Sequence, residues 1–464
     1  MHASTPARVL IAFLLSSLTL FAQTPAEWRA HRSEFLRHLS EKSVAIFMAN
    51  PEYLRNGDVE YDYRQSSDFY YLTGLPEKEA MLLLAPAGIP MREFGRRVKE
   101  ILFVMPRNPL AETWEGIRLG PQGAKEHLGF DVVLTNDRFE ELVERALAGA
   151  DSVYVETVRT RLHEPLNESL DFIKRARERF PSFVVADPRK ILPPMREIKS
   201  EAEMALLRKA IDITCAGHRE VMRSAKPGMR EYELQAMLEY VFKQNGSERL
   251  GFPSIVGSGP NSCILHYRAG NRIINDGEVV VIDIGAEYGM YTADVTRTIP
   301  INGKFTKEQA AIYQIVYDAQ EAAFQKIKPG AAFREPHEAS ARVVVGGLLQ
   351  LGILKGTVEE NLSNRAYTEF FLHGSNHYIG LDVHDAGTLG ALKPGVVITV
   401  EPGIYISEVT AQKYGLHKNY VNIGVRIEDD VLVTATGYEL LSGSVPRARA
   451  EIEALMAQTG KFEH

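Results

Sequence analysis

The sequence predicts two folded domains, an α/β domain followed by an α+β domain whose sheet is largely antiparallel. In the first part of the chain, short apolar runs of β type alternate with charged stretches of helical type. A proline-rich segment interrupts both patterns, and beyond it glycine-rich turns, strands and long amphipathic helices follow one another. With 464 residues, 45% of them hydrophobic and 24% charged, the chain has the length and composition of a two-domain globular protein.

The first 22 residues have the pattern of a signal peptide. Arg8 is their only lysine or arginine, an apolar stretch runs from Val9 to Phe21, and Ala22 precedes polar residues. A buried amino-terminal helix is the alternative. The signal peptide is favoured because the stretch is too short to span a bilayer stably and stops at a small residue. We therefore expect residues 1–22 to be removed and the mature protein to be exported, either to the periplasm or to the medium. No later apolar run is long enough for a membrane span, so we expect no membrane association after removal.

The charge distribution restricts the class of partner. The formal net charge is −7, and acidic and basic residues are interspersed. Binding of nucleic acid would require a basic surface that this pattern does not provide, so we expect a small or peptidic partner. The two cysteines, Cys215 and Cys263, are too few for a disulfide framework, although a single bridge between them is possible.

The predicted α/β domain spans residues 23–187. Its strand-like runs lie at 44–48, 81–85, 101–105 and 183–186, and a helical stretch lies at 138–148. The segment 187–195 contains three prolines, which cannot continue a helix or a central strand. We therefore place a linker at residues 188–198.

The predicted α+β domain spans residues 199–464. It opens with a long helix, because Ser200 and Glu203 form a capping-box pattern ahead of apolar residues spaced for one helix face. Strands are predicted at 279–284 and 396–400, and a helix is predicted at 307–326.

Two aspartates lie on consecutive β-rich runs joined by a glycine-containing turn. If the turn is centred on Tyr288 and Gly289, antiparallel pairing places Asp283 directly opposite Asp294. Two ionised carboxylates that close repel each other unless a cation lies between them. The pattern favours a metal site, and the alternative is that one aspartate caps a turn while the other pairs with Arg297.

Three histidines and two glutamates extend this candidate site. His373, His377 and His384 fall close together in a chain with 13 histidines, and Glu401 and Glu428 each end an apolar β-like run. Such residues, taken singly, are often structural or solvated. Together, four carboxylates and an imidazole suit two divalent ions, manganese first and then zinc, cobalt or iron. Metal pairs of this kind support hydrolysis.

These residues resemble those of aminopeptidase P and its relative prolidase, within the creatinase-like peptidases of pita-bread fold. Residues 58–74, Asp-Val-Glu-Tyr-Asp-Tyr-Arg-Gln-Ser-Ser-Asp-Phe-Tyr-Tyr-Leu-Thr-Gly, are similar to a signature of the aminopeptidase P amino-terminal domain. In the second domain, all of the expected metal ligands have counterparts in the expected order. The resemblance implies that the second domain is a pita-bread catalytic domain with a mainly antiparallel, curved sheet.

The resemblance also implies a role for each site residue. The implied metal ligands are Asp283, Asp294, His377, Glu401 and Glu428. Asp294 and Glu428 would bridge both metals, and Glu401 would also be the general base. His266, His373 and His384 are implied to bind substrate or to shuttle protons. Arg426 is implied to orient the last glutamate.

The activity implied by the resemblance is metal-dependent hydrolysis of the amino-terminal Xaa-Pro bond of peptides, by attack of a hydroxide that bridges the two metals. The implied partners are peptides with proline at the second position, and the implied assembly is a homo-oligomer, either a dimer or a tetramer. Three alternatives share the fold. They are a prolidase that cleaves only Xaa-Pro dipeptides, a metal-free creatinase-type amidinohydrolase, and a binding module without catalysis.

Overall fold

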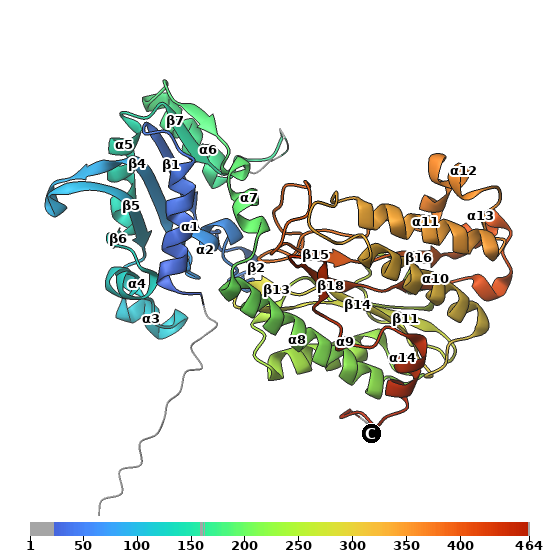
Figure 1. The fold of residues 1–464 in the computed structure, drawn as a ribbon. Helices are drawn as coiled ribbons and strands as arrows, with labels where there is room; N and C mark the ends of the chain where they lie inside the picture. The colour runs from blue at the N-terminus through green and yellow to red at the C-terminus, as the bar shows by residue number, and fades with distance from the viewer. Residues whose placement is uncertain (1–22, 158–160, 162, 463–464) are drawn as a thin grey trace, which may run out of the picture.

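The computed structural model describes residues 23–157, 161 and 163–462, which form two domains (Figure 1). The predicted signal peptide, residues 1–22, lies outside the described residues. Within the described ranges, every helix is too short or too polar to cross a bilayer.

The amino-terminal domain is built on a six-stranded mixed sheet in the order β6-β5-β4-β1-β7-β8. β1 (Ser43–Met48) pairs antiparallel with β4 (Met81–Met91) and parallel with β7 (Ser152–Val155). The remaining strands of the sheet are β5 (Arg96–Val104), β6 (Val133–Thr135) and β8 (Val184–Ala186). The helices are α1 (Pro25–Arg37), α2 (Ser67–Thr73), α3 (Pro109–Glu115), α4 (Gly120–Leu128), α5 (Phe139–Leu147) and α6 (Glu168–Arg179), and β2 (Leu54–Asn56) and β3 (Val59–Glu60) form a separate hairpin.

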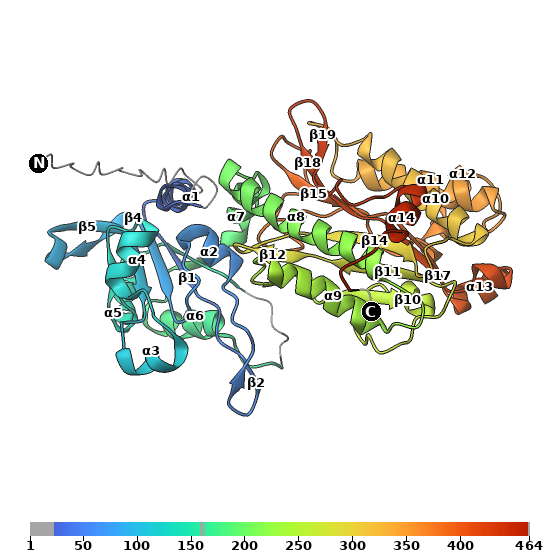
Figure 2. The ribbon, with the colours of Figure 1, turned by 90° about the horizontal axis from the view of Figure 1, so that it is seen from below.

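The predicted linker contains a short helix that was not predicted from the sequence. Residues 188–198 include the 3-10 turn η3 (Pro188–Lys190) and the helix α7 (Leu192–Glu197). Pro193 and Pro194 occupy the first turn of α7, where a backbone N–H has no partner within the helix, so they do not interrupt it. The prolines thus begin a helix here, and the linker stays a prediction that did not include this helix. α7 lies at the junction of the two domains in both views (Figures 1 and 2).

The second domain places antiparallel strands between two groups of helices. It opens with α8 (Glu201–Ser224), and the predicted capping box of Ser200 and Glu203 is confirmed. α8 and α9 (Glu231–Gln244) contact one side of the strands, while α10 (Lys307–Phe324) contacts the other side and packs against α11 (Glu335–Gln350) (Figure 1). The smaller helices are α12 (Val358–Ser363), α13 (Glu408–Tyr414) and α14 (Arg449–Met456).

The strands of this domain form short antiparallel sheets, as predicted. Their orders are β10-β11-β14, β13-β12-β9, β15-β18-β19 and β16-β17. The strands before residue 301 are β9 (Arg249–Leu250), β10 (Ile255–Ser258), β11 (Val279–Ile284), β12 (Ala286–Tyr288), β13 (Tyr291–Thr292) and β14 (Val295–Pro300). The later strands are β15 (Val397–Val400), β16 (Gly403–Ile406), β17 (Ile423–Arg426), β18 (Asp429–Val433) and β19 (Tyr438–Leu440).

One hydrophobic core continues across the domain boundary. The same cluster contains Leu72 of α2 and Leu207 of α8, both fully buried. Burial of apolar surface therefore stabilises the contact between the domains as well as each domain. Cys215 and Cys263 are both free thiols, so the possible bridge between them is not formed.

Candidate active site

Asp283 and Asp294 belong to one hairpin, but its register differs from the predicted one. The turn is centred on Gly289 and Met290, whose φ angles of 58° and 72° are the left-handed values of a type I′ turn. Asp283 therefore pairs with Thr296 rather than with Asp294. Asp294 precedes Thr296 by two residues and is a diagonal neighbour of Asp283 on the same face. The predicted direct pairing was wrong, yet both carboxylates line one cavity.

The five predicted metal ligands converge on that cavity, which has a volume of about 500 Å³. Nε2 of His377 lies 3.5 Å from Oδ2 of Asp294 and 3.6 Å from Oε1 of Glu401. The same nitrogen lies 4.0 Å from Oε1 of Glu428. Asp283 is the penultimate residue of β11, Glu401 follows β15, and Glu428 lies between β17 and β18. Strand ends from several sheets therefore bring the ligand-type side chains together.

Three of these carboxylates each have one buried oxygen without a hydrogen-bond donor. The atoms are Oδ1 of Asp283, Oδ1 of Asp294 and Oε1 of Glu428. A buried polar atom left without a partner destabilises a fold, and a carboxylate does so more than a neutral group. A divalent cation would satisfy all three oxygens. The donor set, rich in oxygen with one imidazole nitrogen, fits manganese, zinc, cobalt or iron.

The electrostatics of the site also favour a cation. Burial, followed by repulsion from neighbouring carboxylates, raises the pKa of Asp294 and of Glu428 well above the usual range. Burial raises the pKa of Glu401 to about 7, although the charges of His377 and Arg426 oppose the shift. The site is thus too crowded with negative charge to ionise fully at neutral pH, and a bound cation would reverse this effect.

His377 is oriented with one nitrogen facing the carboxylates. Its Nδ1 lies 2.9 Å from the carbonyl oxygen of Tyr378, which can only accept a hydrogen bond. Nδ1 therefore carries a proton, and Nε2 is the ring nitrogen that faces the carboxylates. This is the tautomer that a metal-binding histidine requires.

Arg426 lines the same cavity and is connected to two of the carboxylates. Its Nη2 is 2.6 Å from Oδ2 of Asp283. Its Nε donates to Oγ1 of Thr296 at 3.2 Å, and that hydroxyl donates to Oε2 of Glu428 at 2.6 Å. The resemblance implied that Arg426 orients the last glutamate, and the structure connects the two residues through Thr296. Sequence analysis missed Thr296, although it lies on the strand face of Asp294.

Tyr405 connects Arg426 to His373. The tyrosine hydroxyl accepts from Nη1 of Arg426 at 2.7 Å and lies 2.7 Å from Nε2 of His373. Nδ1 of His373 donates to the carbonyl oxygen of Gly374, so Nε2 accepts from the hydroxyl. Burial and the charge of Arg426 lower the pKa of His373 to about 3, which leaves the ring neutral. No periodicity of the sequence pointed to Tyr405.

The other two predicted histidines also line the cavity. His384 packs edge-to-face against His377, with ring centroids 4.5 Å apart. Burial and the neighbouring His377 lower the pKa of His384. His266 lines the same cavity, as does the exposed Arg268, which sequence analysis did not select. The apolar part of the wall consists of Phe252, Pro253, Ile255, Leu265 and Val383.

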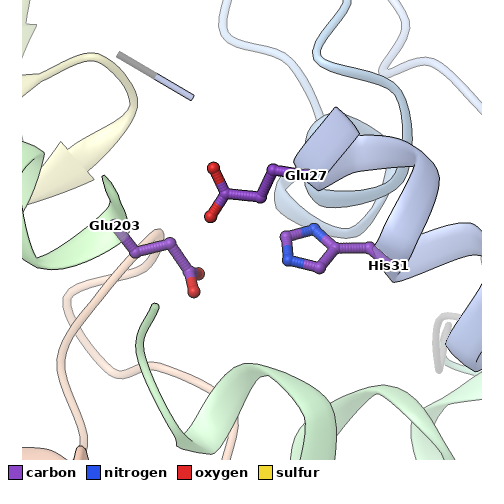
Figure 3. A group of neighbouring side chains, drawn as sticks. All are labelled: Glu27, His31 and Glu203. Carbon is purple, nitrogen blue, oxygen red and sulfur yellow. The ribbon is translucent and has the colours of Figure 1, made fainter. Parts of the chain in front are cut away.

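A second group of ligand-type side chains lies where α1 meets the start of α8 (Figure 3). It consists of Glu27, His31 and Glu203. Oε1 of Glu203 accepts from the hydroxyl of Tyr291 at 2.8 Å, and Oε2 accepts from the backbone N–H of Ser200 at 2.8 Å. The hydroxyl of Ser200 donates to Glu27. Both carboxylates therefore already accept hydrogen bonds without a metal ion. We interpret this group as part of the contact between the two domains.

The chain matches two families along its length. Residues 205–435 match metallopeptidase family M24, and residues 28–154 match the aminopeptidase P amino-terminal domain.

Individual relatives match over nearly the whole chain. An Xaa-Pro aminopeptidase of Escherichia coli is 38% identical over 94% of this chain and 98% of its own length. Xaa-Pro aminopeptidase 3 of Homo sapiens is 32% identical over 89% of this chain and 81% of its own. The solved structure of Pseudomonas aeruginosa aminopeptidase PepP superposes with a TM-score of 0.86, with 38% identity, over 94% of this chain and 99% of that one.

Proposed function

This chain belongs to metallopeptidase family M24 and is an Xaa-Pro aminopeptidase of pita-bread fold, and on that premise we propose how its cavity performs the reaction. The proposed ligands of two divalent metal ions are Asp283, Asp294, His377, Glu401 and Glu428. When bound, such a pair acidifies a water molecule and polarises the carbonyl of the scissile bond. The buried carboxylate oxygens without donors, beside Nε2 of His377, carry this proposal.

Manganese is the proposed metal. Four carboxylates and one imidazole form a ligand set that suits a hard to borderline ion, and zinc, cobalt and iron are the competitors. Asp294 and Glu428 are the proposed shared ligands. Their support is that Asp294, His377 and Glu428 offer ligand atoms that all lie within 4.8 Å of one another, and that burial and then the charge of Asp294 raise the pKa of Glu428. Metal analysis after reconstitution with each ion would rank the four candidates.

The surrounding side chains are proposed to move protons and to bind the peptide. Glu401 is the proposed general base, since its carboxylate lines the cavity with Oε1 3.6 Å from Nε2 of His377. His266, His373 and His384 line the cavity around the carboxylates. We assign them to binding the substrate carbonyl and to delivering a proton to the proline nitrogen.

The proposed substrates are peptides with proline at the second position. The Xaa-Pro bond is a tertiary amide with a rigid ring and no N–H, so a peptidase that reads an extended backbone handles it poorly. The apolar wall between Phe252 and Leu265 offers a surface against which such a ring can pack.

A prolidase activity is the second candidate, and substrate length separates the two. We expect the manganese-loaded protein to cleave Ala-Pro-Ala, which a strict dipeptidase would leave intact. Cleavage of Ala-Pro alone would establish the prolidase instead. A protein that cleaves neither peptide and binds no stoichiometric metal would instead support a binding module of the same fold.

We propose that the protein is exported by the signal peptide at residues 1–22. The support is the single basic residue followed by an apolar stretch and a small residue. Mass spectrometry of exported protein should place the mature amino terminus at or near Gln23, and a chain that retains residues 1–22 would refute cleavage. The homo-oligomer implied by the resemblance stays a prediction.

A further inference from the structure

The loop that carries His384, residues 380–385, has charged contacts on the side away from the cavity. Val383 and His384 line the cavity. The carboxylates of Asp382 and Asp385 bind elsewhere. Nη2 of Arg196, on α7, lies 2.8 Å from Oδ2 of Asp382 and also donates to Asp385. Nζ of Lys199 lies 2.7 Å from the second oxygen of Asp385.

The amino-terminal domain adds a second set of contacts to the same loop. Oγ of Ser67 donates to Oδ1 of Asp382 at 2.7 Å. The guanidinium of Arg64 donates to the carbonyl oxygen of Leu381 and, at 3.0 Å, to Ser67. Asp68 accepts from Nη1 of Arg196 at 2.7 Å. Ser67 and Asp68 begin α2, which lies beside the second domain (Figures 1 and 2).

Three of the charged groups are buried, and burial restricts their geometry. The side chain of Arg196 is 4% exposed, and those of Asp385 and Lys199 are each 1% exposed. Charge-assisted hydrogen bonds in such surroundings are short and directional, and loss of one partner leaves an uncompensated charge.

The loop has little room to shift. A Cβ atom added at Gly380 would lie 2.2 Å from Oδ2 of Asp385 and 2.8 Å from Cε of Lys199. On the opposite side, the carbonyl oxygen of Gly380 accepts from the N–H of Thr292 at 2.9 Å, two residues before Asp294. The contacts with the amino-terminal domain and α7 therefore fix the backbone on either side of His384 relative to the carboxylate centre.

We propose that the amino-terminal domain and α7 together position His384 for catalysis within the same chain, with Arg196, Asp382 and Ser67 as positioning residues. None of the three lines the cavity. The inference rests on the proposed function, in which His384 contacts the substrate. A misplacement of roughly 1 Å in a reacting group can lower a rate on the order of 100-fold, so contacts outside the cavity can govern kcat. A network that only docks the domains would instead affect stability alone.

A double-mutant cycle on kcat for Ala-Pro-Ala tests the proposal. Arg196→Gln should lower kcat by about tenfold or more, with KM changed by less than about threefold. In a His384→Ala background, the same substitution should lower kcat by less than about twofold, because the residue that it positions is absent. Ser67→Ala, which removes one hydroxyl, should give a smaller loss in the wild type, and that loss should also largely disappear in the His384→Ala background.

Two controls make the cycle specific. In a His266→Ala background, the loss caused by Arg196→Gln should be undiminished, because the contacts of Arg196 lie on the loop of His384. Arg208→Gln removes an ion pair with Glu439 whose side chains are 42% and 44% exposed, and it should leave kcat unchanged in every background.

Equal losses in the wild type and in His384→Ala would overturn the positioning role, as would lowered thermal stability with unchanged kcat. If Arg196→Gln does not fold, the same cycle can be measured with Ser67→Ala and Asp382→Asn. Asp382 is 42% exposed, so it should tolerate substitution better than the buried Arg196. A metal-loaded wild type that fails to cleave Ala-Pro-Ala would overturn the proposed function. Equal losses in an enzyme that does cleave it would overturn the positioning role alone.

Discussion

Nη2 of Arg426 lies 2.6 Å from Oδ2 of Asp283, while Oδ1 of the same carboxylate is buried without a donor. The arginine thus neutralises one oxygen and leaves the other available to a cation. The same guanidinium reaches Glu428 through Thr296 and supports His373 through Tyr405. One side chain therefore orients two of the carboxylates and one histidine of the cavity.

Arg426→Gln should destabilise the metal-free protein and weaken metal binding. The change leaves the buried carboxylate of Asp283 without its partner, which costs about 3–5 kcal/mol in the free energy of unfolding. Urea denaturation measures this cost. Arg208→Gln is the matched control, because breaking its exposed pair with Glu439 should cost less than about 1 kcal/mol. Equal losses in the two variants would contradict the role given to Arg426.

Asp294→Asn should lose at least one metal ion per chain while keeping its fold. The substitution preserves size, removes a ligand charge and relieves repulsion from Asp283 and Asp430. The metal-free variant should therefore be at least as stable as metal-free wild type at neutral pH. Elemental analysis after dialysis and a thermal melt measure the two effects. His31→Ala, in the second group of ligand-type residues, should keep full metal content, and full content in Asp294→Asn would argue against the ligand assignment.

Stabilisation by manganese should be larger at pH 8 than at pH 5.5. In the metal-free fold, the pKa values of Asp294 and Glu428 are raised, and that of Glu401 is about 7. An acid whose pKa is raised by folding contributes stability below its unfolded pKa, about 4 for carboxyls, and loses it as pH rises through the folded pKa. A bound cation removes this loss. Thermal melts with and without manganese at both pH values provide the comparison, and equal increments in Tm would be inconsistent with these shifts.

Gly285→Ala should unfold or strongly destabilise the hairpin that carries both aspartates. A Cβ atom at Gly285 would lie 1.6 Å from the carbonyl oxygen of Ala293, so the backbone beside Asp294 would have to move. We expect a loss of about 3 kcal/mol or more in the free energy of unfolding. Gly346→Ala, on α11 with no atom within 4 Å of its Cβ position, should instead stabilise the protein by about 0.5–1 kcal/mol. Similar effects of the two substitutions would disprove the close approach.

Local sequence patterns predicted the elements and most of the candidate site. The strand at 279–284 and the capping box of Ser200 and Glu203 follow from residue type and spacing alone. The register of the hairpin did not, because Gly289 is compatible with a turn centred on either side of it. In the structure the two central residues of the turn are Gly289 and Met290, not Tyr288 and Gly289, and both have positive φ angles.

Contacts between distant segments were beyond prediction from the sequence. The guanidinium of Arg64 binds the carbonyl oxygen of Leu381, 317 residues away, and Arg196 binds Asp385, 189 residues away. Charged residues of these types are common on protein surfaces, so nothing in their sequence neighbourhoods distinguishes buried partners. Only the packing of α2 and α7 against the second domain brings them together.

Anomalous diffraction from manganese-loaded crystals tests the central claim most directly, because the chain offers two groups of ligand-type side chains. We predict two anomalous peaks in the catalytic cavity, coordinated by Asp283, Asp294, His377, Glu401 and Glu428. A cavity without such peaks, or a peak only between Glu27, His31 and Glu203, would contradict the metal centre from which the proposed chemistry follows.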